Sequence, residues 1–123
     1  MIGSIGVALA VLFYAAIGTA ALLRPQTLLA HFDLPAETRN ARNEIRAVYG
    51  GLPLAMAGLL LFALLADTAL RPGILVALAV VSLGMPAGRL IAALVDGGIG
   101  RVPALFAGLE LLGAGAIAAG LLA

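Results

Sequence analysis

The chain contains four apolar runs of about 20 residues each, and this pattern limits its fold more than any other feature. At ~1.5 Å of rise per residue, a helix of this length crosses the ~30 Å hydrocarbon core of a bilayer. The predicted spans are about 2–23, 45–65, 74–95 and 103–122. Because hydrocarbon offers no partner for backbone polar groups, each run is predicted to be a helix. We therefore expect one domain over residues 1–123, an all-α integral membrane four-helix bundle.

The composition favours the same class of protein and excludes others. Hydrophobic residues make up 63% of the chain and charged residues 11%, with a mean hydropathy of +1.18. So few charged side chains cannot coat a water-soluble globule. The net charge of +1 argues against a nucleic-acid partner. With no cysteine and a lone His31, the sequence excludes thiol redox chemistry, disfavours a transition-metal site and indicates no cofactor.

The connections between the spans predict how the helices run. Arg71-Pro72-Gly73 separates the second and third spans, Asp96-Gly97-Gly98 ends the third, and Pro103 suits the first turn of the fourth. These short turns make neighbouring helices antiparallel. The connection between helices 1 and 2 is longer. Pro25 can begin a short helix there, and we expect this interfacial segment to lie in the plane of the membrane surface.

Arginine placement predicts orientation. Positive residues of short loops stay on the cytoplasmic side of a membrane. The opposite side holds Arg71, whereas the two connections on one side hold Arg24, Arg39, Arg42, Arg46 and Arg101. We therefore predict a multi-pass protein of a bacterial inner membrane, with both termini outside.

Two charged residues, Arg89 and Glu110, interrupt the third and fourth spans at a similar depth, roughly 10 Å below the cytoplasmic surface. An arginine inside a span costs ~2.5–3.5 kcal/mol on insertion scales, and ionisable groups at this depth usually face the bundle interior. We predict that Arg89 and Glu110 form an ion pair, with Glu44 or Arg46 close by.

The entry to the second span adds further polar groups at the same end of the bundle. Glu44 and Arg46 lie about 200° apart on a helix and must face different neighbours. Pro53 and Pro86 each remove a backbone hydrogen bond and are predicted to kink their helices. No residue is assigned a catalytic role. The candidate ligand-binding or buried polar cluster comprises Arg42, Asn43, Glu44, Arg46, Tyr49, Arg89 and Glu110.

Each member of this cluster also has a structural interpretation. The Arg89–Glu110 pair can serve only to fix the register of two helices. Arg42 and Arg46 can extend to lipid phosphates, and Tyr49 can be a packing residue.

Helical faces predict which sides of the spans are packed. Small residues spaced along one face allow two helices to approach closely. One such face runs through Glu44, Ala47, Gly51, Ala55 and Gly58. In the first span, Tyr14 shares a face with Val7, Ala10 and Gly18, and this pattern indicates an inward position.

Several of these motifs together resemble a family of uncharacterised small bacterial membrane proteins related to the DoxX-like group. The residues that carry the resemblance are Arg24-Pro25, Leu34-Pro35, the stretch Arg42-Asn43-Glu44-Ile45-Arg46-Ala47-Val48-Tyr49-Gly50-Gly51, Gly88-Arg89-Leu90, Asp96-Gly97 and Leu109-Glu110-Leu111. The resemblance covers nearly the whole chain. It implies a four-helix membrane bundle with the same polar positions, and it brings no established activity.

Three functions from different classes fit this pattern. The first is a non-enzymatic bundle that binds a small amphipathic or lipid-like ligand, with Arg89 and Arg46 meeting an acidic or carbonyl group. The second is a small proton-coupled multidrug-type transporter in which Glu110 exchanges protons. The third is a structural or accessory subunit of a membrane complex, as a homo-oligomer or with another protein. Acid–base catalysis on a lipid is chemically compatible with Glu and Tyr, but no motif indicates an enzyme.

Overall fold

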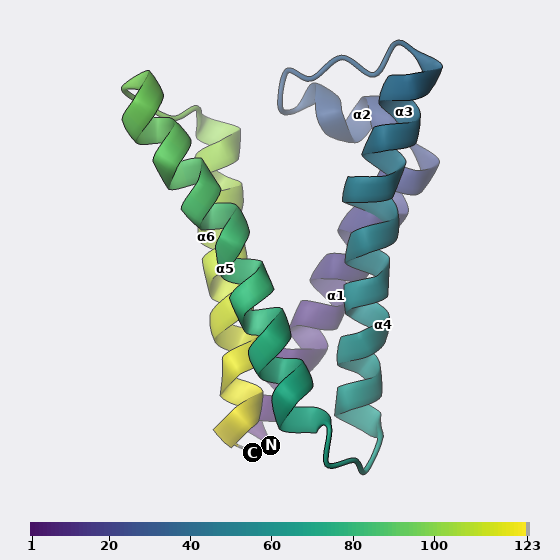
Figure 1. Cartoon of the computed structure of the whole chain (residues 1–123), viewed down its shortest axis with the longest axis vertical. Helices are drawn as coiled ribbons and strands as arrows, with labels where there is room; N and C mark the ends of the chain where they lie inside the picture. Colours follow the sequence, from purple (N-terminus) through teal and green to yellow (C-terminus); the bar gives the residue numbers. More distant parts are fainter. Residues whose placement is uncertain (123) are drawn as a thin grey trace.

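The computed structural model describes residues 1–122, and these residues form helices joined by short connections (Figure 1). The bundle is built from four long helical stretches, of which the second is interrupted, with one short helix between the first two. In chain order the elements are α1 (Ile2–Leu23), α2 (Pro25–Ala30), α3 (Arg39–Ile45), the π-helical turn η1 (Arg46–Gly51), α4 (Leu52–Leu65), α5 (Arg71–Asp96), α6 (Arg101–Ala119) and the 3₁₀ turn η2 (Gly120–Leu122).

Four stretches are long and apolar enough to cross a membrane, which confirms the predicted all-α four-helix bundle. They are Ile2–Leu23, Arg39–Leu65, Arg71–Asp96 and Arg101–Leu122. The second begins at Arg39, six residues before the predicted span. The hydroxyl of Thr38 accepts a hydrogen bond from the Ala41 N–H at 3.0 Å, and this cap lets the helix continue beyond its apolar part.

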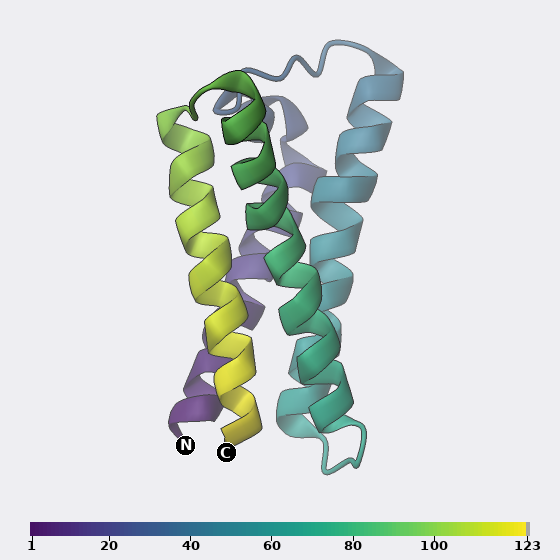
Figure 2. The same cartoon turned by 60° about the vertical axis from the view of Figure 1, so that its left-hand side comes forward.

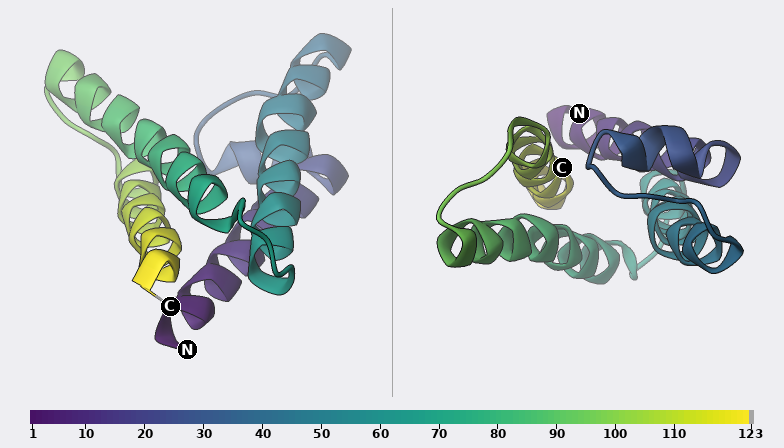
Figure 3. Two further views of the ribbon diagram at one scale, coloured as in Figure 1. Left: turned by 60° about the horizontal axis from the view of Figure 1, so that its bottom comes forward. Right: turned by 90° about the horizontal axis from the view of Figure 1, so that it is seen from above.

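The helices form two arms that meet at one end of the molecule and separate toward the other (Figures 1 and 2). One arm pairs α5 with α6, and the other consists of α3, η1 and α4 packed against α1. Helix α1 joins the arms, because it also packs against α6. The start of α1 and the end of α6 lie at the closed end, whereas α2 and the α5–α6 turn lie at the open end (Figure 1). The view from above shows the two arms on opposite sides (Figure 3).

The closed end holds the main core. Its buried side chains include Val7, Leu60, Leu75 and Ile117, which come from four different helices. The backbones also approach closely, since a Cβ added at Gly6 would lie 2.7 Å from the carbonyl oxygen of Ala116 on α6. Tight packing at this end therefore fixes the point from which the arms separate.

Tyr14 is buried on α1, as its helical face predicts, and it belongs to this core and links the two arms. Its hydroxyl hydrogen-bonds the hydroxyl of Ser82 on α5.

At the open end, α1 packs against the second helix through glycine. A Cβ added at Gly18 would lie 2.8 Å from the carbonyl oxygen of Gly50, so no larger residue fits without separating the helices. Gly50 belongs to η1, in which the Leu52 N–H donates to the carbonyl of Ala47, five residues back. The irregularity predicted at Pro53 thus takes the form of a π-helical turn directly before it.

The burial of the second helix corrects one prediction about packing. The face predicted to pack closely, which runs through Glu44, Ala47, Gly51, Ala55 and Gly58, is exposed. At ~100° per residue these five residues do share one face, but the buried residues occupy the opposite face, so the small residues do not mark the packed side of this helix. The buried residues from this part of the chain are Ile45, Gly50, Pro53, Met56, Ala57 and Leu60.

The connections are fixed by specific caps. Gly97 adopts φ 76°, a left-handed conformation that favours glycine, and ends α5 where the sequence predicts. Arg71 closes the other hairpin, because its Nε donates to the Ala63 carbonyl at 2.6 Å and its Nη2 donates to the Ala66 carbonyl at 2.9 Å. Helix α2 begins at Pro25 as predicted.

Candidate ligand site

A cavity of about 460 Å³ lies between the two arms, and we call it the inner cavity. This volume falls within the range of ordinary small-molecule sites. Side chains from both arms and from the α2 region line it: Phe13, Tyr14, Ile17, Leu28, Phe32, Val48, Tyr49, Leu52, Pro53, Met56, Val81, Met85, Gly88, Arg89, Ala92, Phe106 and Glu110. Within residues 1–122, Arg89 and Glu110 are the charged members of this wall.

The structure forms the predicted ion pair between Arg89 and Glu110. The Arg89 Nε donates to Glu110 Oε1 at 2.8 Å, and its Nη2 donates to Oε2 at 3.0 Å. This two-pronged geometry is the strongest arrangement of a guanidinium and a carboxylate. The Glu110 side chain is 4% exposed and the Arg89 side chain 22% exposed, so the guanidinium is the more accessible partner.

Two aromatic rings hold the guanidinium. Its carbon atom lies 5.5 Å from the centre of the Phe32 ring and 6.0 Å from the centre of the Phe106 ring. The two rings contact each other edge to face, with centres 4.9 Å apart. Cations at this distance from an aromatic ring are attracted by its π electrons. Phe32 and Phe106 thus limit the movement of Arg89.

The candidate cluster from the sequence omits both aromatic residues, although signals for them exist. Phe106 precedes Glu110 by four residues, which places the two on one helical face. Phe32 belongs to the apolar side of the interfacial segment, but the sequence does not indicate that this segment reaches α6.

The predicted cluster is only partly assembled at the cavity. Tyr49 lines the cavity with Arg89 and Glu110, whereas Arg42, Asn43, Glu44 and Arg46 do not. The Arg46 Nε donates to the carbonyl of Leu22, at the end of α1, at 2.9 Å. The Arg42 Nη1 donates to the carbonyls of Ala36 and Glu37 at 3.2 and 2.9 Å. Asn43 and Glu44 are exposed. As ligand-binding residues, all seven stay predictions.

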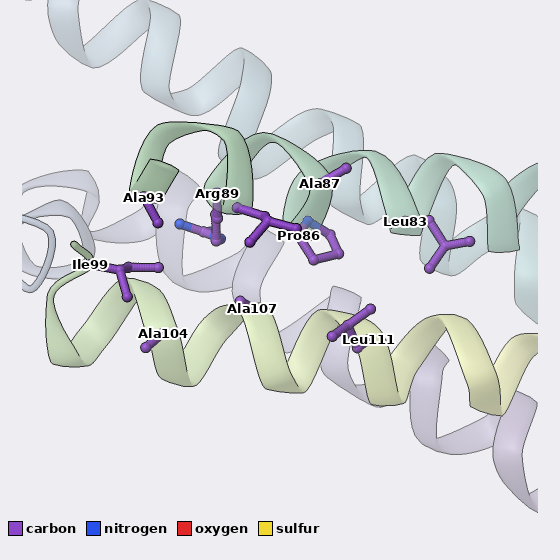
Figure 4. Close-up of a pocket in the computed structure, with 10 residues that line it drawn as sticks. Leu83, Pro86, Ala87, Arg89, Ala93, Ile99, Ala104, Ala107 and Leu111 are labelled. Carbon is purple, nitrogen blue, oxygen red and sulfur yellow. The ribbon is translucent and has the colours of Figure 1, made fainter. Parts of the chain in front are cut away.

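A second depression of about 510 Å³, the outer groove, lies between α5 and α6. Figure 4 shows its lining side chains, which are apolar apart from Arg89. Its members are Leu83, Pro86, Ala87, Arg89, Leu90, Ala93, Ile99, Ala104, Ala107 and Leu111. Arg89 therefore stands between the inner cavity and the outer groove and borders both.

This arrangement is suited to hydrogen bonding inside an apolar cavity. Among residues 1–122, no group of three His, Cys, Asp or Glu side chains is placed to hold a metal ion. The Tyr14 hydroxyl is bound to Ser82, and both carboxylate oxygens of Glu110 accept from Arg89. Because Glu110 and Tyr14 are also nearly fully buried, the remaining N–H groups of Arg89 and the hydroxyl of Tyr49 are the accessible polar side-chain groups of the cavity wall.

The fold and the site together define a small multi-pass membrane protein with a polar pair inside an apolar cavity. Residues 2–121 match the family described as "Domain of unknown function (DUF4345)", and the chain belongs to that family. Comparison with curated proteins and with solved structures found no match. Family membership confirms the resemblance to a family without an assigned function. The DoxX-like grouping, the bacterial source and the orientation stay predictions.

Proposed function

We propose that this protein binds an amphipathic, lipid-like molecule in the inner cavity, with Arg89 as the main polar contact. One observation carries the proposal: an arginine with free N–H groups stands in the wall of a cavity that is otherwise lined almost wholly by apolar side chains. Such a cavity offers apolar surface to a hydrocarbon chain and a fixed polar group to its head.

The free hydrogen-bonding capacity of Arg89 can be counted. A guanidinium carries five N–H groups, and the pair with Glu110 uses two of them. Three N–H groups therefore remain, on a side chain that is 22% exposed. An N–H group in an apolar region gains more from a partner than it would in water, and a ligand oxygen supplies that partner.

The rim of the cavity indicates how an amphipathic molecule would enter. Val48 and Leu52 belong to one arm and Val81 and Met85 to the other, and all four line the cavity while remaining exposed. Exposed apolar residues within a spanning region face lipid. A ligand tail can therefore pass between η1–α4 and α5 into the bilayer while its head stays at Arg89.

The geometry favours binding over proton exchange. A carboxylate that exchanges protons needs an oxygen accessible to its substrate, whereas both Glu110 oxygens accept hydrogen bonds from Arg89. Glu110 thus supports Arg89 rather than acting as a separate group.

Native mass spectrometry of the protein released in its own membrane lipids tests the proposal. We expect one co-purifying small molecule at a stoichiometry near one in wild type. The variant Arg89→Met/Glu110→Leu replaces the pair by apolar side chains of similar size, a change that buried ion pairs often tolerate. It should lose the molecule. The control Arg101→Gln removes one exposed arginine that lies outside the cavity wall and should keep it.

A wild-type spectrum that shows bare protein or only bulk phospholipid would contradict the proposal. Such a spectrum together with a tightly bound second polypeptide would favour the accessory-subunit interpretation.

A further inference from the structure

We infer that the head group bound at Arg89 is uncharged and accepts hydrogen bonds through a carbonyl oxygen, as the ester of a diacylglycerol does. This inference rests on the proposed function and specifies its ligand class. It follows from three features of the inner cavity: its charge balance, the kinds of polar atoms in its wall, and the support of Arg89 by neighbouring rings.

The first feature is the absence of an uncompensated charge in the wall, as far as residues 1–122 show. Arg89 and Glu110 cancel each other at a distance of 2.8 Å. Arg42 and Arg46 donate to backbone carbonyls elsewhere and do not line the cavity. An anionic or cationic head would have to leave water without gaining an opposite charge, and this desolvation is unfavourable in an apolar region.

The second feature is an excess of hydrogen-bond donors. The three remaining N–H groups of Arg89 can donate but not accept. Glu110 already accepts from Arg89 through both oxygens and its side chain is 4% exposed, while Tyr14 is paired with Ser82 and is 2% exposed. The remaining lone pairs of both groups are therefore little accessible to a ligand. Tyr49 adds one hydroxyl, which can donate or accept, so donors still outnumber acceptors among the accessible side chains. A carbonyl oxygen complements this wall, whereas an amine offers it further donors.

The third feature is that Arg89 is already in position. Phe32 and Phe106 lie beside the guanidinium, and Glu110 binds it from helix α6. A donor group that is fixed before binding loses little freedom when the ligand arrives. A weakly polar carbonyl can therefore be bound without the attraction of a full charge.

The test compares three photoreactive probes with equal chains in phosphatidylcholine vesicles that contain the protein. The probes are a diazirine diacylglycerol, the matching diazirine phosphatidic acid, and a diazirine alkane that has no head group. Mass spectrometry of peptides from η1, α4 and α5 measures labelling at the cavity. In wild type we expect roughly tenfold more labelling by the diacylglycerol than by the phosphatidic acid, which corresponds to about 1.4 kcal/mol.

Two variants make the test specific. Glu110→Gln leaves the guanidinium with an unbalanced positive charge, so its preference should reverse toward phosphatidic acid. Arg89→Met/Glu110→Leu removes the donors, so labelling by both head groups should fall to the level of the alkane.

Equal labelling by the two head groups, or more labelling by phosphatidic acid in wild type, would overturn this inference and leave the proposed function in place. If both head-group probes label wild type no more than the alkane does, this inference and the proposed function are both overturned.

Discussion

The Arg89–Glu110 pair predicts an unusual order of stabilities among four proteins: wild type, Arg89→Met, Glu110→Leu and the double variant. Each single change leaves one charge without its partner at membrane depth, whereas the double change leaves none. The double variant should therefore be more stable than either single variant, because the two effects are strongly coupled.

The exposures of the two side chains set the magnitudes. Arg89→Met leaves the carboxylate of Glu110, which is 4% exposed, and should cost about 3–5 kcal/mol of unfolding free energy. Glu110→Leu leaves Arg89, which is 22% exposed and can turn toward the membrane surface, so we expect a smaller cost of about 2–3 kcal/mol. The double variant should lie within about 1 kcal/mol of wild type. The coupling free energy is then at least about 4 kcal/mol.

Steric trapping in lipid bicelles measures these free energies. The chain contains no cysteine, so biotin labels attached to two introduced cysteines report on unfolding without background labelling. The reasoning would be refuted by a double variant whose unfolding free energy is no higher than that of the less stable single variant. Such a result would show that the two charges do not compensate each other in the membrane.

Three further changes test the packing around the cavity by the same assay. Gly18→Ala should cost about 1–3 kcal/mol, because its Cβ would lie 2.8 Å from a carbonyl oxygen of η1. The control Gly58→Ala, whose Cβ meets nothing within 4 Å, should change stability by less than about 0.5 kcal/mol; equal effects would argue against this helix contact. Tyr14→Phe should cost about 1 kcal/mol by removing the bond to Ser82, and an unchanged stability would show that this bond does not join the arms. Arg71→Gln should cost about 1–2 kcal/mol and speed hydrogen exchange in the last turn of α4; unchanged exchange would count against its role as a cap.

The features that follow from chain-local physics could be predicted from the sequence. Four apolar runs fixed the number of spans, because hydrocarbon leaves the helix as the only conformation for such a run. The pairing of Arg89 with Glu110 followed from similar depth and from the cost of a lone charge in a span. The end of α5 at Gly97 followed from the φ that only glycine adopts readily.

The features that depend on the shape of the backbone could not be predicted. The π-helical turn η1 has no signal in the sequence, and the small residues of the second helix do not show which of its faces packs against α1. The separation of the arms depends on close contacts such as that of Gly6 with Ala116 on α6, two residues that are 110 positions apart in the sequence. Arg46 binds a carbonyl at the end of α1 instead of joining the cavity, and no pattern in the sequence indicates that partner.

The most direct test of ligand binding is photocrosslinking inside living membranes from a single position in the cavity wall. p-Benzoylphenylalanine in place of Tyr49, which lines the inner cavity, leaves the Arg89–Glu110 pair intact. The same residue in place of Leu61, an exposed position of α4 outside the cavity wall, reports on the surrounding lipid. We predict one defined, uncharged adduct from position 49 and a mixture of bulk phospholipids from position 61. The same phospholipid mixture from both positions would contradict the account.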